Sequence, residues 1–257
     1  MARREGIAAD PTGQVQGSPP DFDHAARSRG RVLRAIAVLV GTAVTALVAL
    51  LLLGYLVVGR HGGGMIQGWD DTVGRWYVHH RSGLVGGSKV VAFLGDAAFL
   101  SVIAGALTVV LLFTIRSVRA LVPIVAYLGG EGLVYVTREF IHRHRPPTAV
   151  FPAAGAIRGI HETSYSFPSG HAVAVTAVLF AVLGTAALAL RTWWPWVLAL
   201  AASLFVVDTR LVLGVHWFSD VVFGLPLGAA WGVAVALTAR TIEWSDVAGA
   251  LRRPRTT

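Results

Sequence analysis

Six apolar runs, each long enough to cross a bilayer, constrain this chain more than any other feature of its sequence. A helix needs about 20 consecutive apolar residues to span the hydrocarbon core of a membrane. The composition agrees, because 54% of the residues are hydrophobic and only 14% are charged, whereas soluble domains carry about 25% charged residues. We therefore expect an all-α bundle of six transmembrane helices, at about 32–58, 89–115, 120–141, 168–190, 197–213 and 216–239.

The polar segments around these runs predict the rest of the organisation. The first residues mix charges with prolines and show no apolar period, which is typical of a disordered tail. Between the first two spans, Trp69, Val73 and Trp76 recur at helical spacing within a polar stretch, which predicts a short helix lying at the membrane interface. The chain is thus divided into a cytosolic tail at 1–30, one membrane domain at 31–241 and a basic cytosolic tail at 242–257.

Basic residues beside the apolar runs predict how the chain is oriented. The net charge is +8, but Lys and Arg are spread along the chain rather than gathered into one stripe, so we expect lipid headgroups and no nucleic acid as partners. Cytosolic loops are enriched in Lys and Arg, and here both tails, the turn at Arg116 and Arg119, and Arg191 are basic. We therefore expect a multi-pass protein of the plasma (inner) membrane with cytosolic termini. The chain has no cysteine, which excludes disulfides and thiol chemistry.

Three polar clusters lie at the ends of the later spans, on the side predicted to face outward. They are Arg138-x6-Arg145-Pro146, Pro168-Ser169-Gly170-His171 and Thr209-Arg210-x5-His216-x3-Asp220. Ionisable side chains are costly near a bilayer and usually mark a functional site. Because all three clusters fall on one side of the membrane, they predict a single site that handles phosphate.

The histidines supply the chemistry expected at such a site. His216 and Asp220 are four residues apart and share one helix face. The carboxylate can therefore bind one ring nitrogen and leave the other free to attack phosphorus, forming a phosphohistidine. His171, at the start of another helix, can donate a proton to the departing oxygen.

The remaining members of the clusters are expected to hold the phosphate. Guanidinium groups present fixed forks of donors that match phosphate oxygens, so Arg138, Arg145 and Arg210 form the expected clamp. Ser169 and Gly170 open a helix whose free backbone N–H groups attract an anion. No metal is expected at the site, because a cluster of arginines would repel a cation.

These clusters resemble the signature of the type-2 phosphatidic acid phosphatase superfamily, the lipid phosphate phosphatases, which reads Lys-x6-Arg-Pro, Pro-Ser-Gly-His and Ser-Arg-x5-His-x3-Asp. The six spans are similar to its bacterial integral membrane branch. Arg138 stands where the family usually has Lys, and Thr209 where it has Ser. The resemblance implies a hydrolase of lipid phosphates that needs no metal or other cofactor. It implies His216 as nucleophile, His171 as general acid and Asp220 as orienting carboxylate, with Arg138, Arg145, Arg210, Ser169 and Gly170 as phosphate ligands.

The substrate and several alternatives stay open. The expected substrate is polyprenyl pyrophosphate (such as undecaprenyl pyrophosphate), phosphatidylglycerol phosphate or phosphatidic acid at the outer leaflet. A lipid phosphotransferase would use the same phosphohistidine and pass the phosphate to another alcohol. A non-catalytic phospholipid-binding transporter would need the arginines but not the histidines. A zinc hydrolase is disfavoured because no zinc-binding spacing is present; its ligands would come from His142, His144, His161, His171, His216 and Asp220. The oligomeric state is open as well.

Overall fold

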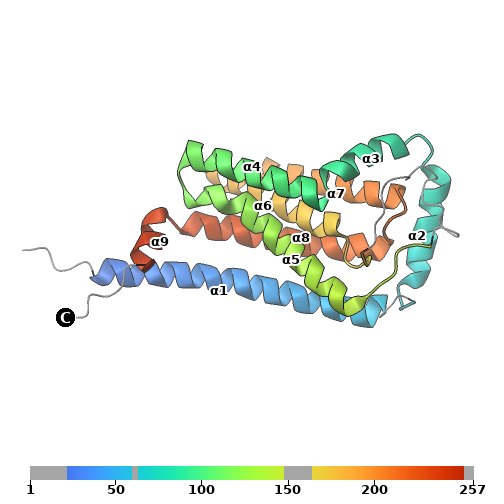
Figure 1. Ribbon diagram of the computed structural model, residues 1–257, viewed down its shortest axis with the longest axis horizontal. Helices are drawn as coiled ribbons and strands as arrows, with labels where there is room; N and C mark the ends of the chain where they lie inside the picture. The colour runs from blue at the N-terminus through green and yellow to red at the C-terminus, as the bar shows by residue number, and fades with distance from the viewer. Residues whose placement is uncertain (1–21, 60–62, 148–163, 252–257) are drawn as a thin grey trace, which may run out of the picture.

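The computed structural model describes residues 22–59, 63–147 and 164–251, and every regular element within them is a helix (Figure 1). Within these described ranges, six stretches are long and apolar enough to cross a membrane, which confirms the all-α, six-span prediction. In chain order the elements are α1 (Phe22–Leu53), the π-helical turn η1 (Gly54–Val58), α2 (Gln67–His80), α3 (Val85–Leu94), α4 (Ala97–Ile115), the 3-10 turn η2 (Val118–Leu121), α5 (Val122–Ile141), the π-helical turn η3 (His171–Val175), α6 (Thr176–Leu190), α7 (Trp194–Val212), α8 (Phe218–Thr241) and α9 (Trp244–Leu251).

The run predicted as one span at 89–115 is divided into two helices, so that prediction is wrong in its first part. α3 ends at Leu94 and α4 begins at Ala97. Between them, the Asp96 carboxylate accepts a hydrogen bond of 3.0 Å from the Ala98 N–H and caps the start of α4. Of these two helices, only α4 has the length of a span, and α3 packs against α7 near the end of the bundle at which α2 lies (Figure 1).

Helices extend into both predicted tails. α1 begins at Phe22, well before the predicted end of the first tail, and residues 1–21 lie outside the described part of the chain. After α8, α9 packs on α1, and Arg31 Nε lies 2.8 Å from Asp246 Oδ1. Burial alone would raise the pKa of the Asp246 carboxyl, but the Glu243 amide and the Arg31 guanidinium outweigh it and hold that pKa below its usual value. The segment after the last span is therefore partly helical, up to Leu251.

Glycines on α8 let this helix lie directly against η3 and α6. A Cβ atom at Gly228 would lie 2.4 Å from the carbonyl oxygen of Val173, and one at Gly232 would lie 2.4 Å from the carbonyl oxygen of Ala177. Neither Cβ would fit, so the two backbones meet without an intervening side chain. Small residues allow this close approach between membrane helices. Here it brings the helix that follows Ser169 next to the helix that carries Asp220.

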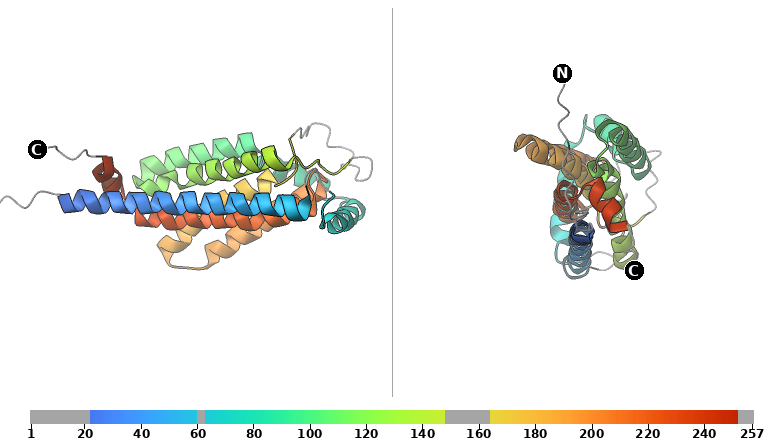
Figure 2. Two further views of the ribbon diagram at one scale, coloured as in Figure 1. Left: turned by 90° about the horizontal axis from the view of Figure 1, so that it is seen from below. Right: turned by 90° about the vertical axis from the view of Figure 1, so that its left-hand side faces the viewer.

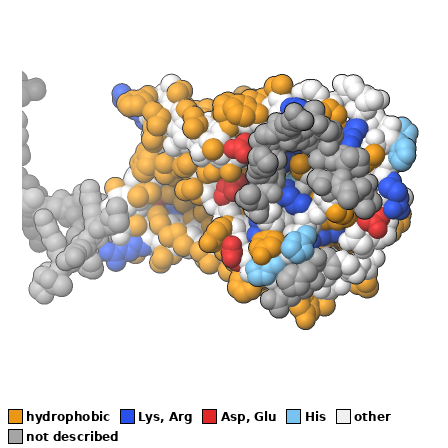
Figure 3. Space-filling view, turned by 45° about the vertical axis from the view of Figure 1, so that its right-hand side comes forward, with side chains coloured by type: hydrophobic (Ala, Val, Ile, Leu, Met, Phe, Trp, Pro, Cys, Tyr) orange, Lys and Arg blue, Asp and Glu red, His pale blue; other side chains and the backbone are white. Residues whose placement is uncertain are grey.

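The two ends of the bundle differ in character. α2 lies across one end, whereas α9 and the start of α1 lie at the other (Figures 1 and 2). Hydrophobic side chains cover the flank between the ends, and histidine, acidic and basic side chains gather at the α2 end (Figure 3). On α1, for example, Leu33 and Val44 are 65% and 54% exposed. Such a flank suits contact with lipid chains, and the chain is a multi-pass membrane protein with one polar end.

Candidate active site

His216 and Asp220 meet at the start of α8. His216 precedes the helix, and Asp220 lies in its first turn, where its Oδ2 accepts a hydrogen bond of 2.9 Å from the Trp217 N–H. The same carboxylate oxygen lies 3.3 Å from His216 Nδ1. Both side chains are buried. The carboxylate that caps the helix therefore also fixes the imidazole ring.

Arg145 contacts the other nitrogen of this imidazole. Its Nη1 lies 3.1 Å from His216 Nε2 and donates a hydrogen bond of 2.8 Å to the Val215 carbonyl. A guanidinium can only donate, so Nε2 must present its lone pair and the ring proton must lie on Nδ1, facing Asp220. The His216 lone pair is thus directed at a cationic group.

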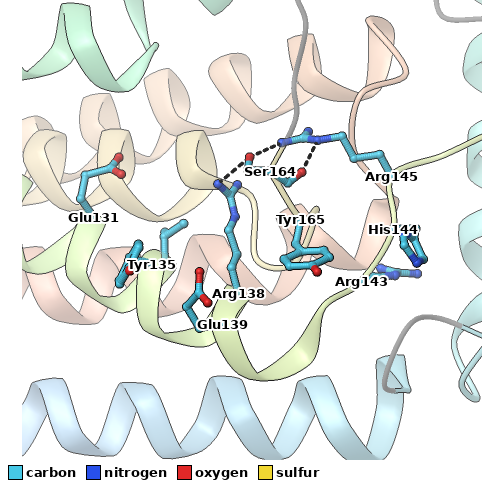
Figure 4. Close-up of a pocket in the computed structure, with 10 residues that line it drawn as sticks. Glu131, Tyr135, Arg138, Glu139, Arg143, His144, Arg145, Ser164 and Tyr165 are labelled. Atoms are coloured by element: carbon cyan, nitrogen blue, oxygen red, sulfur yellow. Dashed lines mark hydrogen bonds between the residues drawn. The ribbon is translucent and has the colours of Figure 1, made fainter.

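Arg138 and Arg145 converge on one residue, Ser164, although they do not share a helix face. α5 ends at Ile141, and His142 adopts a left-handed conformation with φ of 52°. Beyond this turn, Arg145 Nη2 lies 3.1 Å from Ser164 Oγ, and Arg138 Nη1 lies 3.2 Å from the same oxygen (Figure 4). Arg145 Nε also donates to the Ser164 carbonyl at 3.0 Å. Two guanidinium forks are therefore aimed at one small polar group.

The cluster Pro168-Ser169-Gly170-His171 contacts the other two clusters, but its helix start and its backbone hydrogen bonds differ from the prediction. The helix begins at Gly170 rather than at Pro168, and the Ser169 N–H donates to the Asp220 carbonyl at 3.1 Å. The prediction that this amide is free for an anion is therefore wrong. The Ser169 hydroxyl is buried and has no hydrogen-bond partner among the described residues. Arg138 Nη2 donates to the Pro168 carbonyl at 3.2 Å and would lie 3.7 Å from a Cβ atom at Gly170.

His171 and Arg210 are the two remaining site residues predicted from the sequence. His171 Nε2 lies 2.8 Å from the carbonyl oxygen of Ala92 in α3, so this nitrogen carries a hydrogen, and a second proton on the ring would be carried by Nδ1. Gly95 makes room for the ring, because a Cβ atom there would lie 2.5 Å from His171 Cδ2. Arg210 is 1% exposed at the end of α7, and its carbonyl accepts from the Val215 N–H at 3.3 Å.

Three buried residues were not predicted from the sequence. Arg143 places Nη1 2.7 Å from Asp220 Oδ1 and Nη2 2.6 Å from Asp70 Oδ2. Asp70 comes from α2 and also accepts hydrogen bonds of 2.7 Å from the backbone N–H and the hydroxyl of Ser219. Arg143 lies within the first cluster but at none of its motif positions, and Asp70 is followed by Asp71, which has the same chemistry. No sequence signal separates them from solvated charges.

A pocket of about 630 Å³ opens beside the arginines, within the range usual for ligand pockets (Figure 4). One wall is the face of α5, and the other is the segment after α5 together with Ser164 and Tyr165. His216 lines a separate cavity of about 20 Å³, together with Asp70 and Tyr77. The hydrogen bond from Arg145 to His216 connects the larger pocket to this histidine. The pocket is lined by Glu131, Val134, Tyr135, Arg138, Glu139, Arg143, His144, Arg145, Ser164 and Tyr165.

Six spans and a buried arginine, histidine and carboxylate cluster at one end define an integral membrane protein with a site suited to anions. The PAP2 superfamily model matches residues 119–244, which include all three clusters. The match spans just under half of the chain, which is thus similar to proteins of the PAP2 superfamily.

Two curated relatives match parts of the chain. An undecaprenyl-diphosphatase of Sulfolobus acidocaldarius is 37% identical over 67 residues, which are 26% of this chain and 30% of that protein. Phosphatidylglycerophosphatase B of Bacillus subtilis is 27% identical over 143 residues, which are 54% of this chain and 66% of that protein. The matched stretches thus cover about a third and just under two thirds of the lengths of these relatives.

A solved structure shares the fold. It is the crystal structure of a transmembrane PAP2 type phosphatidylglycerolphosphate phosphatase from Bacillus subtilis, with a TM-score of 0.60 and 22% sequence identity. The superposition covers 77% of this chain and 94% of that chain. The six-span arrangement is therefore that of a transmembrane PAP2 protein.

Proposed function

We propose that this protein is a metal-independent phosphatase that hydrolyses a lipid phosphate or pyrophosphate through a phosphohistidine. The observation that carries the proposal is the position of His216, whose Nδ1 lies 3.3 Å from Asp220 and whose Nε2 lies 3.1 Å from Arg145. One ring nitrogen is held by a carboxylate, and the other is directed at a group that binds phosphate oxygens. This is the arrangement that a histidine nucleophile requires.

In the first step, His216 Nε2 attacks phosphorus. The N–P bond forms while the bond from phosphorus to the leaving oxygen breaks, and His171 gives that oxygen its Nδ1 proton. The products of this step are a phosphohistidine and either a lipid alcohol or, from a pyrophosphate, a lipid monophosphate. The arginine clamp (Arg138, Arg145 and Arg210) offsets the negative charge on the other phosphate oxygens throughout.

In the second step, water attacks the phosphohistidine. His171, now neutral, takes a proton from the water, the N–P bond breaks and inorganic phosphate leaves. Asp220 holds the Nδ1 proton of His216 in both steps, which keeps Nε2 as the reacting nitrogen. The Ser169 hydroxyl, buried and without a hydrogen-bond partner among the described residues, is a donor suited to a phosphate oxygen.

The proposed substrate is a lipid with a terminal phosphate or diphosphate. The pocket of about 630 Å³ accommodates a headgroup, and the apolar flank of the bundle suits the lipid chains. The two relatives are named for undecaprenyl diphosphate and phosphatidylglycerophosphate as substrates. We propose these two lipids and phosphatidic acid as the candidates.

Phosphate release by the purified, detergent-solubilised protein tests this reaction. The three candidate lipids are compared in excess EDTA, with His216→Ala as the test variant and His79→Ala, an exposed histidine of α2, as its matched control. We expect turnover that persists in EDTA, disappears in His216→Ala and is unchanged in His79→Ala. Turnover lost in EDTA would contradict the metal-independent reaction, and an active His216→Ala variant would exclude the phosphohistidine.

We also propose that the site faces the outer side of the inner membrane, with both termini in the cytosol. The end opposite α2 carries the turns that contain Arg116, Arg119 and Arg191, and basic turns favour the cytosol. The chain contains no cysteine, so single cysteines introduced at exposed His79 and Glu243 report the two ends without background. A thiol reagent that cannot cross the membrane should label His79→Cys but not Glu243→Cys in intact cells. The reverse pattern would place the site in the cytosol.

A further inference from the structure

Behind the His216–Asp220 pair lies a chain of buried charges that reaches into α2. Arg143 Nη1 lies 2.7 Å from Asp220 Oδ1, and Arg143 Nη2 lies 2.6 Å from Asp70 Oδ2. The side chains of all three residues are fully buried. Two carboxylates thus share one guanidinium, and the Asp220 oxygen that faces His216 is not the one that contacts Arg143.

Both carboxylate oxygens of Asp70 accept hydrogen bonds from Ser219, which fixes the orientation of this side chain. Its Oδ1 accepts a hydrogen bond of 2.7 Å from the Ser219 N–H, and its Oδ2 accepts one of 2.7 Å from the Ser219 hydroxyl. Ser219 is in the first turn of α8, so a residue of α2 caps the helix that carries Asp220. Asp70 and His216 also line the same small cavity.

Burial makes the charge of Asp70 effective at His216. Charges with no access to water are weakly screened, so each one alters the preference of its neighbours for the charged form. Among the described residues, the titratable and charged groups placed against His216 are Asp220 from α8, Arg145 from the segment after α5, and Asp70 and Tyr77 from α2, which line the same small cavity. Burial, and then the Asp208 carboxylate, raise the pKa of Tyr77, so this group is neutral and adds no charge.

We propose that Asp70 is a positioning residue of the reaction, which acts on His216 through Arg143 and Asp220. The inference rests on the proposed function of His216 as nucleophile. Asp70 offsets the charge of Arg143, so that Asp220 remains an acceptor for the Nδ1 proton of His216 instead of being drawn wholly into its ion pair. It also fixes the guanidinium at the distance that sets the orientation of Asp220. α2 is thereby a part of the catalytic machinery.

The alternative is that Asp70 only fastens α2 to the bundle, and the two roles predict different kinetics. In Asp70→Asn the amide keeps the shape but loses the charge, leaving one cation beside one carboxylate. The loss of this negative charge disfavours imidazolium at His216, so the acidic limb of the pH profile of kcat/KM should move to lower pH, on the order of half a unit. At its optimum pH, kcat should fall about 10- to 100-fold, as expected for a lost charge-assisted hydrogen bond. KM should not rise, because the arginine clamp is intact.

Three further variants distinguish a positioning role of Asp70 from a role that only holds α2 against the bundle. Asp71→Asn, the adjacent residue on α2, is the matched control and should leave kcat, KM and the pH profile unchanged. Asp70→Glu keeps the charge and should restore the acidic limb even where kcat is reduced. Ser219→Ala removes one link between α2 and α8 but no charge, so its acidic limb should stay in place. Folding of every variant is followed by thermal unfolding in the same detergent.

The proposal fails if Asp70→Asn lowers kcat equally at every pH, with an unmoved acidic limb, because that is the signature of attachment alone. If Asp70→Asn does not fold, the pair Asp70→Asn with Arg143→Gln removes one charge of each sign, so the net charge of the buried chain is that of the wild type and the glutamine amide can still donate to Asp220. This double variant should fold and still show kcat lowered about 10-fold or more, and wild-type kcat in it would also overturn the proposal. Failure of the proposed function itself looks different, since the wild-type protein would then release no phosphate or His216→Ala would remain active.

Discussion

Nη1 of Arg145 lies 3.1 Å from Nε2 of His216, so the clamp and the proposed nucleophile are in direct contact. The same guanidinium donates through Nη1 to the Val215 carbonyl and through Nε and Nη2 to Ser164. One planar group therefore fixes the position of the proposed attacking nitrogen relative to the proposed phosphate-binding site. The three contacts come from the loop before α6, the turn before α8 and the histidine itself.

Arg145→Lys should slow the proposed phosphate release although the charge is kept. An ammonium group has no planar fork and cannot serve Ser164, Val215 and His216 together. We expect kcat/KM for the best lipid substrate to fall about 10- to 100-fold, the range for a lost charge-assisted hydrogen bond. Arg75→Lys, at an exposed position on α2, is the control and should match the wild type. Equal kinetics for the two variants would show that charge alone matters at residue 145.

Gly95→Ala should move the imidazole ring of His171, the proposed general acid, while leaving residue 171 itself a histidine. The added methyl group would lie 2.5 Å from His171 Cδ2, so the ring must leave its hydrogen bond to Ala92. We expect kcat on a lipid phosphate to fall about 10-fold or more, since general acid catalysis contributes about 10²–10⁴-fold. An aryl phosphate with a good leaving group needs less protonation and should lose less. Gly105→Ala, which meets nothing within 4 Å, is the control, and a uniform loss on both substrates would argue against the role of His171.

Gly228→Ala should push α8 away from η3. Its Cβ atom would lie 2.4 Å from the Val173 carbonyl, and that neighbour is backbone, which cannot rotate away. Overpacking of this kind costs about 1–3 kcal/mol, and here it would also separate Ser169 from Asp220. A lower unfolding temperature together with lost phosphatase activity is the expected result. Gly132→Ala, also in a helix but with open space around its Cβ position, should affect neither measurement.

The membrane spans and α2 could be predicted from the sequence, because they depend on composition and on the periodic spacing of apolar residues. Long apolar runs identify spans because every residue of a span contributes to the signal, and the spacing of Trp69 and Trp76 was enough to predict α2. Interruptions of a helix that depend on a single residue were not predicted. The division of the second apolar run depends on a single cap at Asp96, whose carboxylate binds the Ala98 N–H. Asp96 is a residue type that caps helices, but one acidic residue in an apolar run does not by itself show that a new helix begins there.

The same distinction applies to the site. Arg138, Arg145 and His216 stand in recognisable clusters, but the contacts of Ser169 and Asp70 depend on how helices far apart in the sequence meet. The Ser169 amide is taken by Asp220 only because glycines on α8 allow that helix to approach η3. Asp70 faces the bundle, whereas its neighbour Trp69 is 66% exposed. Which residues of α2 face the bundle depends on how the helix is rotated about its axis. A polar helix with few apolar residues gives no sequence pattern that predicts this rotation.

Ser164 offers a test of where phosphate binds, because its hydroxyl lies between the two guanidinium groups. Oγ is 3.2 Å from Arg138 Nη1 and 3.1 Å from Arg145 Nη2, the geometry that a phosphate oxygen would adopt. Ser164→Asp would place an internal anion there, whereas Ser164→Asn has nearly the same size without the charge. We expect the aspartate variant to raise KM for the lipid and the inhibition constant of inorganic phosphate by about 10-fold or more.

The asparagine variant should change both constants by much less, since an amide oxygen competes weakly with phosphate for a guanidinium. Inhibition by inorganic phosphate is measured alongside the kinetics, because it reports on the clamp without depending on lipid delivery or on the chemical step. Should Ser164→Asp and Ser164→Asn bind inorganic phosphate equally well, the anion must bind away from the Arg138–Arg145 pair. The clamp would then have to be sought among the other predicted phosphate ligands, Arg210 and Ser169.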